Sequence, residues 1–168
     1  MSPPRDSAPR DDAKSAFIEE MGQVLTGFGM PNMAGRILAA LLVATPPEQT
    51  ASELADTLQA SRGSISTMTR LLETPGLIQR LRKRGDRKVY YRNTPDAWYQ
   101  AMRNEAASMR AVRTMAERGA ELMRHEPDEA RRGIEDTLAF LDFWEREMDA
   151  VLERWSQYRG ARGEGSLR

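Results

Sequence analysis

Between residues 61 and 72 the chain places hydroxyl and guanidinium side chains at helical spacing. Ser61 suits the start of a helix, because its hydroxyl can accept a backbone N–H of the first turn. At about 100° per residue, one face of this helix collects three apolar side chains, namely Ile65, Met68 and Leu72. The other face lacks carboxylates and collects groups that hydrogen-bond base edges and phosphates, namely Ser66, Thr67 and Arg70. The segment therefore predicts a helix that buries one face and offers the other to nucleic acid.

A basic β-hairpin is expected directly after this helix. Pro75-Gly76 should end the helix, because proline disfavours the α region at the residue before it and glycine accepts the turn that follows. Residues 77–84 and 87–92 flank Gly85-Asp86, which predicts a hairpin with this pair near its tip. Against the single acid Asp86, the hairpin carries seven basic residues: Arg80, Arg82, Lys83, Arg84, Arg87, Lys88 and Arg92. Such a density of positive charge suits contact with phosphate.

The N-terminal region is expected to lead from a tail into two helices. Residues 1–11 are rich in proline and charge and have no apolar side chain large enough to anchor them, which predicts a disordered tail. A helix is expected from about residue 12 to residue 27, before a segment broken by glycine and proline. Residues 33–44 are apolar nearly all round, which predicts a central buried helix.

A short helix precedes the polar-faced one. Residues 45–49 are expected to form a loop, and Thr50 with Glu53 fits the capping box that would start a helix ending at Leu58. A short helix, a tight turn and a second helix with a polar outer face predict a helix-turn-helix, and the basic hairpin would add a wing.

Two long helices are expected at the C-terminal end, over residues 97–124 and 129–158. The second has apolar residues spaced alternately by three and four positions, which predicts a heptad seam. Its central members are the candidate dimer interface: Leu141, Trp144, Met148, Val151 and Trp155. A winged domain does not need such a seam for its own core, so we expect a second copy of the chain to cover it. The alternative is that the seam packs on the chain's own helices.

The composition excludes several classes of protein. The 168 residues have a formal net charge of zero, which argues against a non-specific nucleic-acid coat. Without cysteine the chain cannot form a disulfide or a thiol switch, and a single histidine cannot build a conventional zinc site. We find no membrane-spanning run or signal-peptide core, no phosphate loop and no catalytic constellation. We therefore expect a cytoplasmic protein that is no enzyme, needs no metal or cofactor and does not bind membranes.

This order of elements resembles the MarR family of bacterial transcription regulators, including its GbsR/MarR-like branch, over about residues 12–158. It is similar in particular to actinobacterial members that repress lipid- or drug-efflux transporter genes. The resemblance is carried by Glu53-Leu54-Ala55, residues 61–66, Gly76-Leu77-Ile78, and Gly85-Asp86-Arg87 with Tyr90-Tyr91. It implies a mainly α fold with a small β-hairpin wing, that is, a winged helix-turn-helix with N- and C-terminal dimerisation helices.

The same resemblance implies partners and sites. A homodimer would bind a pseudo-palindromic operator in double-stranded DNA, and a small lipophilic or aromatic effector would release it. The wing of such regulators commonly pairs an aspartate with an arginine, here Asp86 and Arg87. The expected DNA-binding residues are Ser61, Arg62, Gly63, Ser66, Thr67, Arg70, Arg84, Asp86, Arg87 and Lys88. The expected regions are the tail 1–11, the N-terminal dimerisation helix 12–32, the DNA-binding domain 33–95, the helical dimerisation region 96–158 and a flexible tail 159–168.

Two alternatives stay open at the level of sequence. An effector pocket is expected from Phe17, Met21, Trp98 and Met102, because thioethers and aromatic rings adapt to varied ligands. The same side chains could instead simply fill a helical core. The winged domain could also be a protein-interaction module that does not bind DNA.

Overall fold

The structure, a computed structural model, describes residues 8–162. It divides into two compact units, with the boundary between Trp98 and Tyr99. Residues 1–7 and 163–168, which the sequence predicts to be parts of loose tails, lie outside the described residues.

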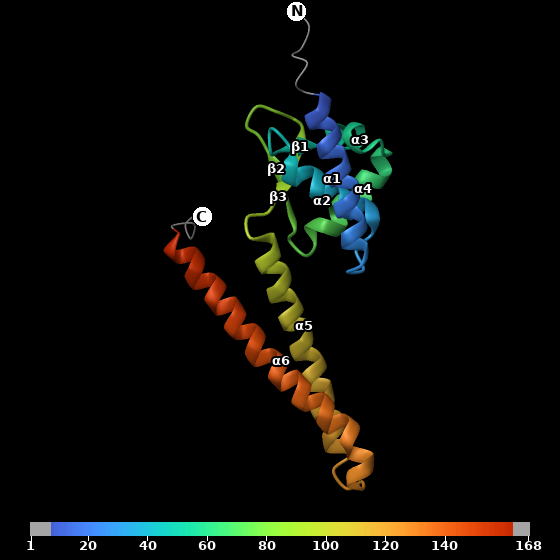
Figure 1. Cartoon of the computed structure of the whole chain (residues 1–168), viewed down its shortest axis with the longest axis vertical. Coiled ribbons are helices and arrows are strands. Elements are labelled where there is room, and N and C mark those ends of the chain that lie inside the picture. Colours follow the sequence, from blue (N-terminus) through green and yellow to red (C-terminus); the bar gives the residue numbers. More distant parts are fainter. Residues whose placement is uncertain (1–7, 163–168) are drawn as a thin grey trace, which may run out of the picture. The chain divides into compact units, whose positions relative to one another are not determined.

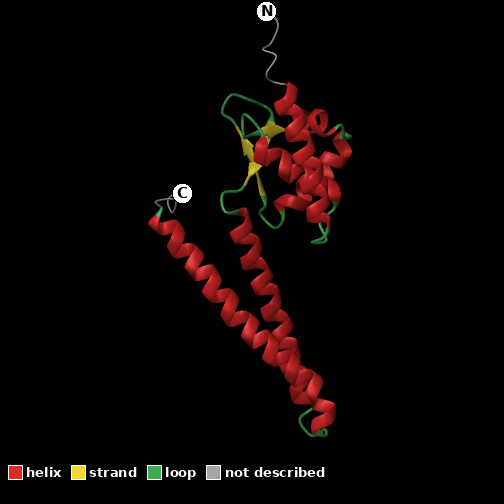
Figure 2. Cartoon of the chain, viewed as in Figure 1, coloured by secondary structure: helices red, strands yellow, loops and turns green. Residues whose placement is uncertain are grey.

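The first unit consists of helices packed beside a small antiparallel sheet (Figures 1 and 2). Its elements in chain order are α1 (Ala8–Thr26), α2 (Asn32–Val43), β1 (Gln49–Thr50), α3 (Ala51–Leu58), α4 (Arg62–Glu73), β2 (Ile78–Arg82) and β3 (Val89–Asn93). The mainly helical fold with a winged helix-turn-helix is therefore confirmed.

Helix α2 is the centre of this unit, as its all-round apolar sequence predicts. Ile37 is fully buried, and Leu38 and Leu41 expose only 2% and 3% of their surface. Helix α1 crosses α2 very closely at Gly22 and Gly35. A Cβ atom built on Gly35 would lie only 3.1 Å from the Cα atom of Gly22. Glycine at both positions lets the two backbones approach to this distance.

The helix-turn-helix has the caps that the sequence predicts. At the start of α3, the backbone N–H of Glu53 donates to the Thr50 hydroxyl at 3.2 Å, and the Thr50 N–H donates to the Glu53 carboxylate at 2.6 Å. At the start of α4, the Ser64 N–H donates to the Ser61 hydroxyl at 3.2 Å. Each cap satisfies donors that the first turn of a helix leaves unpaired. The turn between the helices places Gln59 in the left-handed region, with φ of 49°.

The sheet has three strands in the order β1-β3-β2, with both pairs antiparallel. Strands β2 and β3 form the predicted hairpin, in which Ile78 lies opposite Asn93 and Arg82 opposite Val89. Strand β1 was not predicted, because the sequence analysis assigned residues 45–49 to a loop. Its two residues are too few to show an alternating pattern, and only their partners on β3 define them as a strand.

The second unit consists of α5 (Ala97–Leu122), which begins just before the boundary, and α6 (Asp128–Ala161) (Figure 1). Ion pairs connect the helices: Arg110 contacts Glu145 at 2.9 Å and Asp149 at 2.7 Å, and Arg113 contacts Asp142. Small side chains on α5 are buried, with Ala106 and Ala116 exposing 2% and 5% of their surface. The two helices predicted from the sequence are therefore present.

Two predicted boundaries were wrong. Helix α1 begins at Ala8, and α6 continues to Ala161, so residues 8–11 and 159–161 are helical and do not belong to tails. An acidic residue in the first turn of α1, Asp11, suits the positive end of the helix dipole. The last turn of α6 is supported by a hydrogen bond from the guanidinium of Arg162 to the Tyr158 hydroxyl at 2.9 Å.

The predicted seam on α6 is only partly covered within one chain. Leu141 exposes 4% of its surface and Trp144 and Met148 are half-buried, whereas Val151 and Trp155 expose 47% and 44%. The chain's own helices thus cover the first part of the seam and leave its C-terminal part in solvent.

Candidate nucleic-acid interface

Helix α4 buries a slightly different face from the predicted one. Ile65 and Leu72 are buried as expected, but the third buried side chain is Thr69, with 1% exposure, and Met68 is only half-buried. The Thr69 hydroxyl donates to the backbone carbonyl of Ser66 at 3.2 Å. This bond satisfies the hydroxyl locally, which is why a polar residue can occupy the buried face.

The outer face of α4 presents most of the predicted DNA-binding residues to solvent. Arg62, Gly63, Thr67 and Arg70 are exposed, while Ser66 is half-buried. The guanidinium of Arg70 donates to the Ser66 hydroxyl at 3.0 Å, one helical turn away. This bond orients the Arg70 side chain along the helix surface, with its remaining N–H donors available.

The remaining predicted residue of the helix, Ser61, has a structural role. It is exposed, but its hydroxyl oxygen already accepts the Ser64 N–H as the cap of α4. The hydroxyl hydrogen is still available for donation to an acceptor. Ser61 therefore fixes the start of α4 whether or not it touches a ligand.

The tip of the wing is organised around the carboxylate of Asp86. This carboxylate accepts the backbone N–H of Lys88 at 2.8 Å and the hydroxyl of Tyr90 at 2.7 Å, and Gly85 supplies the positive φ of 82° that the turn needs. The two bonds lower the pKa of Asp86 from its ordinary value, and the Asp86 bond raises the pKa of Tyr90. No ion pair joins Asp86 to Arg87 among the described residues, so the Asp–Arg pair implied by the resemblance is not formed here.

Three predicted cations at the wing are exposed, namely Arg84, Arg87 and Lys88, and within residues 8–162 none of them forms an ion pair. The charge of Lys88 nevertheless helps to lower the pKa of the Asp86 and Glu53 carboxyls. The outer face of α4 and these wing side chains both belong to the first unit. Side chains of this kind can bind phosphate without first breaking an internal ion pair.

One acid at the wing was not predicted from the sequence. Glu48 lies 3.3 Å from the ammonium of Lys83 and 3.8 Å from the guanidinium of Arg92. Counting charges along the hairpin alone could not find it, because Glu48 precedes β1 and comes close only through the pairing of β1 with β3.

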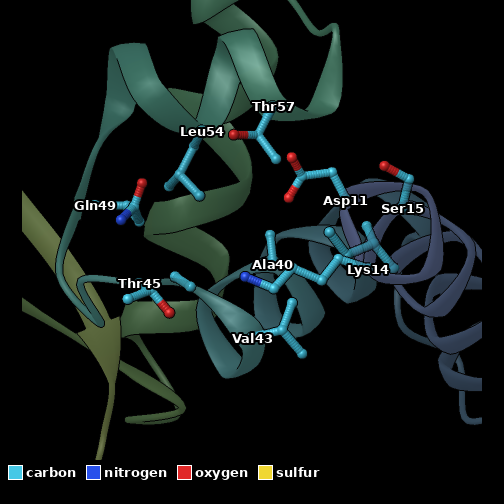
Figure 3. A pocket seen from close by; sticks show the side chains of 11 residues that line it. Asp11, Lys14, Ser15, Ala40, Val43, Thr45, Gln49, Leu54 and Thr57 are labelled. Atoms are coloured by element: carbon cyan, nitrogen blue, oxygen red, sulfur yellow. The ribbon is translucent and has the colours of Figure 1, made fainter. Parts of the chain in front are cut away.

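The predicted effector residues are placed on two helices. Phe17 and Met21 are half-buried on α1, and Trp98 and Met102 on α5 expose 52% and 43% of their surface. The first unit contains a separate cavity of about 350 Å³, which none of these four side chains lines (Figure 3). It is lined by Asp11, Lys14, Ser15, Ile18, Ala40, Val43, Ala44, Thr45, Gln49, Leu54 and Thr57. The effector pocket expected from the sequence stays a prediction.

Neither a candidate metal site nor a candidate membrane-spanning helix is found in the described part of the chain. Residues 8–162 contain no group of three or more His, Asp or Glu side chains that could hold a metal ion. Within the same residues, no helix combines the length and the apolar character needed to span a membrane.

Comparison with known proteins identifies the family. A model described as MmpR5-like MarR family transcriptional regulator matches residues 96–158, and a MarR family model matches residues 36–90. The chain is 34% identical over 144 residues to the HTH-type transcriptional regulator MmpR5 of Mycobacterium tuberculosis. The aligned residues cover 86% of this chain and 87% of that protein. The chain belongs to the MarR family of transcription regulators.

A solved structure supports the fold of this MarR-family chain. The crystal structure of a transcriptional regulator matches it with a TM-score of 0.74 and 33% sequence identity, over 86% of this chain and 99% of the other. The matching proteins are transcription regulators and not enzymes, in agreement with the class expected from the sequence. The chain is therefore a winged-helix DNA-binding regulator, a class that acts as dimers.

Proposed function

We propose that this MarR-family chain is a homodimeric repressor that binds a pseudo-palindromic operator. In each copy α4 enters the major groove, and the wing contacts the backbone or the narrow minor groove. The observation that carries the proposal is the exposed outer face of α4, together with three exposed wing cations that form no ion pair within residues 8–162. A repressor of chromosomal genes acts in the cytoplasm, so a cytoplasmic location is part of this proposal.

The residues of the interface take different roles in the proposal. Arg70 and Arg62 are the candidates for guanine or phosphate contacts, because a guanidinium matches the acceptors of guanine in the major groove. Ser66 and Thr67 make shorter contacts, and Gly63 lets the backbone approach DNA. Arg84, Arg87 and Lys88 bind phosphates and carry little sequence information, whereas Asp86 shapes the tip that presents them.

Dimerisation is proposed from the uncovered side chains of α6. In addition to Val151 and Trp155, the same helix has two exposed aromatic side chains, Phe140 at 61% and Phe143 at 56% exposure. Large aromatic side chains in water indicate an interaction surface, since their burial is strongly favourable. A second copy offers the same surface, as a two-fold interface requires.

The proposal extends to the effector and to the regulated genes. By resemblance to the family, a small lipophilic or aromatic molecule releases DNA, and efflux or transporter genes are the targets. The exposed rings and thioethers at Trp98 and Met102, with Phe17 and Met21, are compatible with such a ligand. Titration of tryptophan fluorescence with lipophilic ligands tests this, and the absence of any saturable change counts against it.

The central experiment compares duplex DNA from upstream of the chain's own gene with random duplex at several salt concentrations. We expect tight, salt-steep binding by two chains per site, and Arg87→Ala should flatten the salt slope by about one on both duplexes. Equal binding to both duplexes would point to a distant operator. The alternative, a protein-interaction module, predicts no salt-dependent binding of either duplex and no effect of Arg87→Ala.

A further inference from the structure

The position of Glu48 follows from the pairing of β1 with β3. Gln49 lies opposite Tyr91 and Thr50 opposite Tyr90, so the antiparallel register carries Glu48 to the level of Arg92. One carboxylate oxygen lies 3.8 Å from the Arg92 guanidinium, and the other lies 3.3 Å from the Lys83 ammonium. A single acid thus contacts cations from both arms of the hairpin.

Lys83 is held by a second interaction. Its ammonium nitrogen lies 4.2 Å from the centroid of the Tyr90 ring, a geometry in which the ring attracts a cation. The Tyr90 hydroxyl in turn donates to Asp86, which fixes the ring in place. Lys83 therefore lies between a carboxylate and an aromatic face.

These contacts divide the basic residues of the wing into two groups. The held group is Lys83 and Arg92, which Glu48 neutralises in part. Lys88 is exposed and forms no ion pair within residues 8–162, although its charge helps to lower the pKa of the Asp86 and Glu53 carboxyls. Together with Lys88, the free group comprises the exposed residues that also form no ion pair within these residues: Arg80, Arg82, Arg84 and Arg87. A held cation must exchange its contact with Glu48 for one with phosphate, so it gains less from binding DNA than a free cation gains.

We propose that Glu48 is a specificity-determining residue of the wing, because it withholds Lys83 and Arg92 from phosphate and so restrains sequence-independent binding. This inference rests on the proposed DNA-binding function. On an operator, base contacts from α4 fix the register of the protein, and geometry decides which cations reach phosphates. On random DNA no register is fixed, so any released cation can find a phosphate. Releasing the held pair should therefore favour random DNA more than the operator.

The test replaces Glu48 by Gln in the full chain and measures binding to operator and random duplexes against salt concentration. We expect the salt slope on random duplex to steepen by about one to two, because up to two more phosphates are neutralised at about 0.9 each. On lowering the salt from about 1 M to about 0.15 M, random binding should therefore tighten by roughly 5–30-fold more for this variant than for the unmodified chain. Operator binding should tighten by less, so the ratio of operator to random affinity falls.

A matched control separates released cations from a simple change of net charge. Glu20→Gln makes the same chemical change on an exposed residue of α1 that forms no described ion pair. It should leave the slope and the affinity ratio close to those of the unmodified chain. A second control, Lys83→Gln, should change little alone but should remove about half of the gain when combined with Glu48→Gln.

The possible outcomes are distinct. If Glu48→Gln weakens binding to both duplexes, the carboxylate merely supports the wing and the withholding role is wrong. If Glu48→Gln and Glu20→Gln have the same effect, net charge alone is responsible and the proposal is also wrong. Failure of the DNA-binding function itself would appear differently, as an unmodified chain that shows no salt-steep binding to any duplex.

Discussion

Arg36 on α2 ties the end of α3 in place by donating from its guanidinium to the backbone carbonyl of Leu58 at 3.1 Å. The same guanidinium donates to the carboxylate of Glu19 on α1 at 2.8 Å, while only 18% of the Arg36 side chain is exposed. One side chain therefore joins α1 and α2 to the last residue of the first helix of the helix-turn-helix. The turn that leads to α4 begins at the next residue.

We expect Arg36→Met to lower the free energy of unfolding by about 1.5–3 kcal/mol, because it removes charge-assisted hydrogen bonds and leaves the Leu58 carbonyl unpaired. Urea denaturation measures the effect. Glu19→Gln is the matched comparison and should cost at most about 1 kcal/mol, because the Glu19 side chain is 51% exposed. Equal losses from the two variants would show that the bond to Leu58 contributes nothing.

The crossing of α1 and α2 should not tolerate a larger residue. A Cβ atom on Gly35 would meet the Gly22 Cα atom at 3.1 Å and the Leu25 Cβ atom at 3.2 Å. We expect Gly35→Ala to lower the free energy of unfolding by about 1–3 kcal/mol. Gly133→Ala on α6 is the control: a Cβ atom there meets nothing within 4 Å, and alanine should stabilise the helix by about 0.5–1 kcal/mol. Thermal or urea unfolding measures the stability of both variants. A Gly35→Ala variant as stable as the unmodified chain would contradict the close crossing.

The wing carboxyl of Asp86 should titrate below its ordinary value of 3.8, because the Lys88 N–H and the Tyr90 hydroxyl both donate to its ionised form. Because the pKa is lowered in the folded state, its contribution to stability is present above the unfolded-state pKa. That contribution is lost as the pH falls through the lowered pKa. NMR titration of the carboxyl measures the midpoint. Tyr90→Phe should raise it toward 3.8, and a midpoint unchanged in this variant would mean that the hydroxyl bond is not formed in solution.

Replacement of Arg70 should affect sequence preference more than general affinity. If Arg70 contacts a guanine, Arg70→Ala should weaken operator binding by about 1–3 kcal/mol and relax the preference at one base position. Binding to operators with single base changes measures this. Arg87→Ala is the comparison, because a phosphate contact weakens operator and random DNA alike. Equal losses on cognate and random DNA for Arg70→Ala would exclude the base contact.

The exposed end of the α6 seam should matter for assembly more than for the fold of one chain. Trp155 exposes 44% of its surface and stacks on Tyr158, with ring centroids 5.6 Å apart. If Trp155 is an anchor of the dimer, Trp155→Ala should weaken dimerisation by about 2 kcal/mol or more, or roughly 30-fold in the dissociation constant. Sedimentation at several concentrations measures it, with helicity followed by circular dichroism. A variant that remains as tightly dimeric as the unmodified chain would place the interface elsewhere.

The helix caps and the hairpin turn could be predicted from the sequence, because each depends on residues a few positions apart. Thr50 with Glu53, the Ser61 cap and the Gly85-Asp86 tip all appear as expected. Their hydrogen bonds close within three or four residues, so the types and spacing of those residues largely decide them. The outer face of α4 and the cations of the wing follow from the same local rules.

Contacts between distant residues were decided only by the tertiary structure. Strand β1 exists because Gln49 pairs with Tyr91, and this pairing is what brings Glu48 to the wing cations. Thr69 replaces Met68 on the buried face of α4, because the packing of the whole unit fixes the rotation of that helix. The sequence by itself thus determined which elements form and which chemical groups they carry. Which of those groups remain free for DNA depended on long-range packing and charge pairing, which a periodic pattern along the chain does not contain.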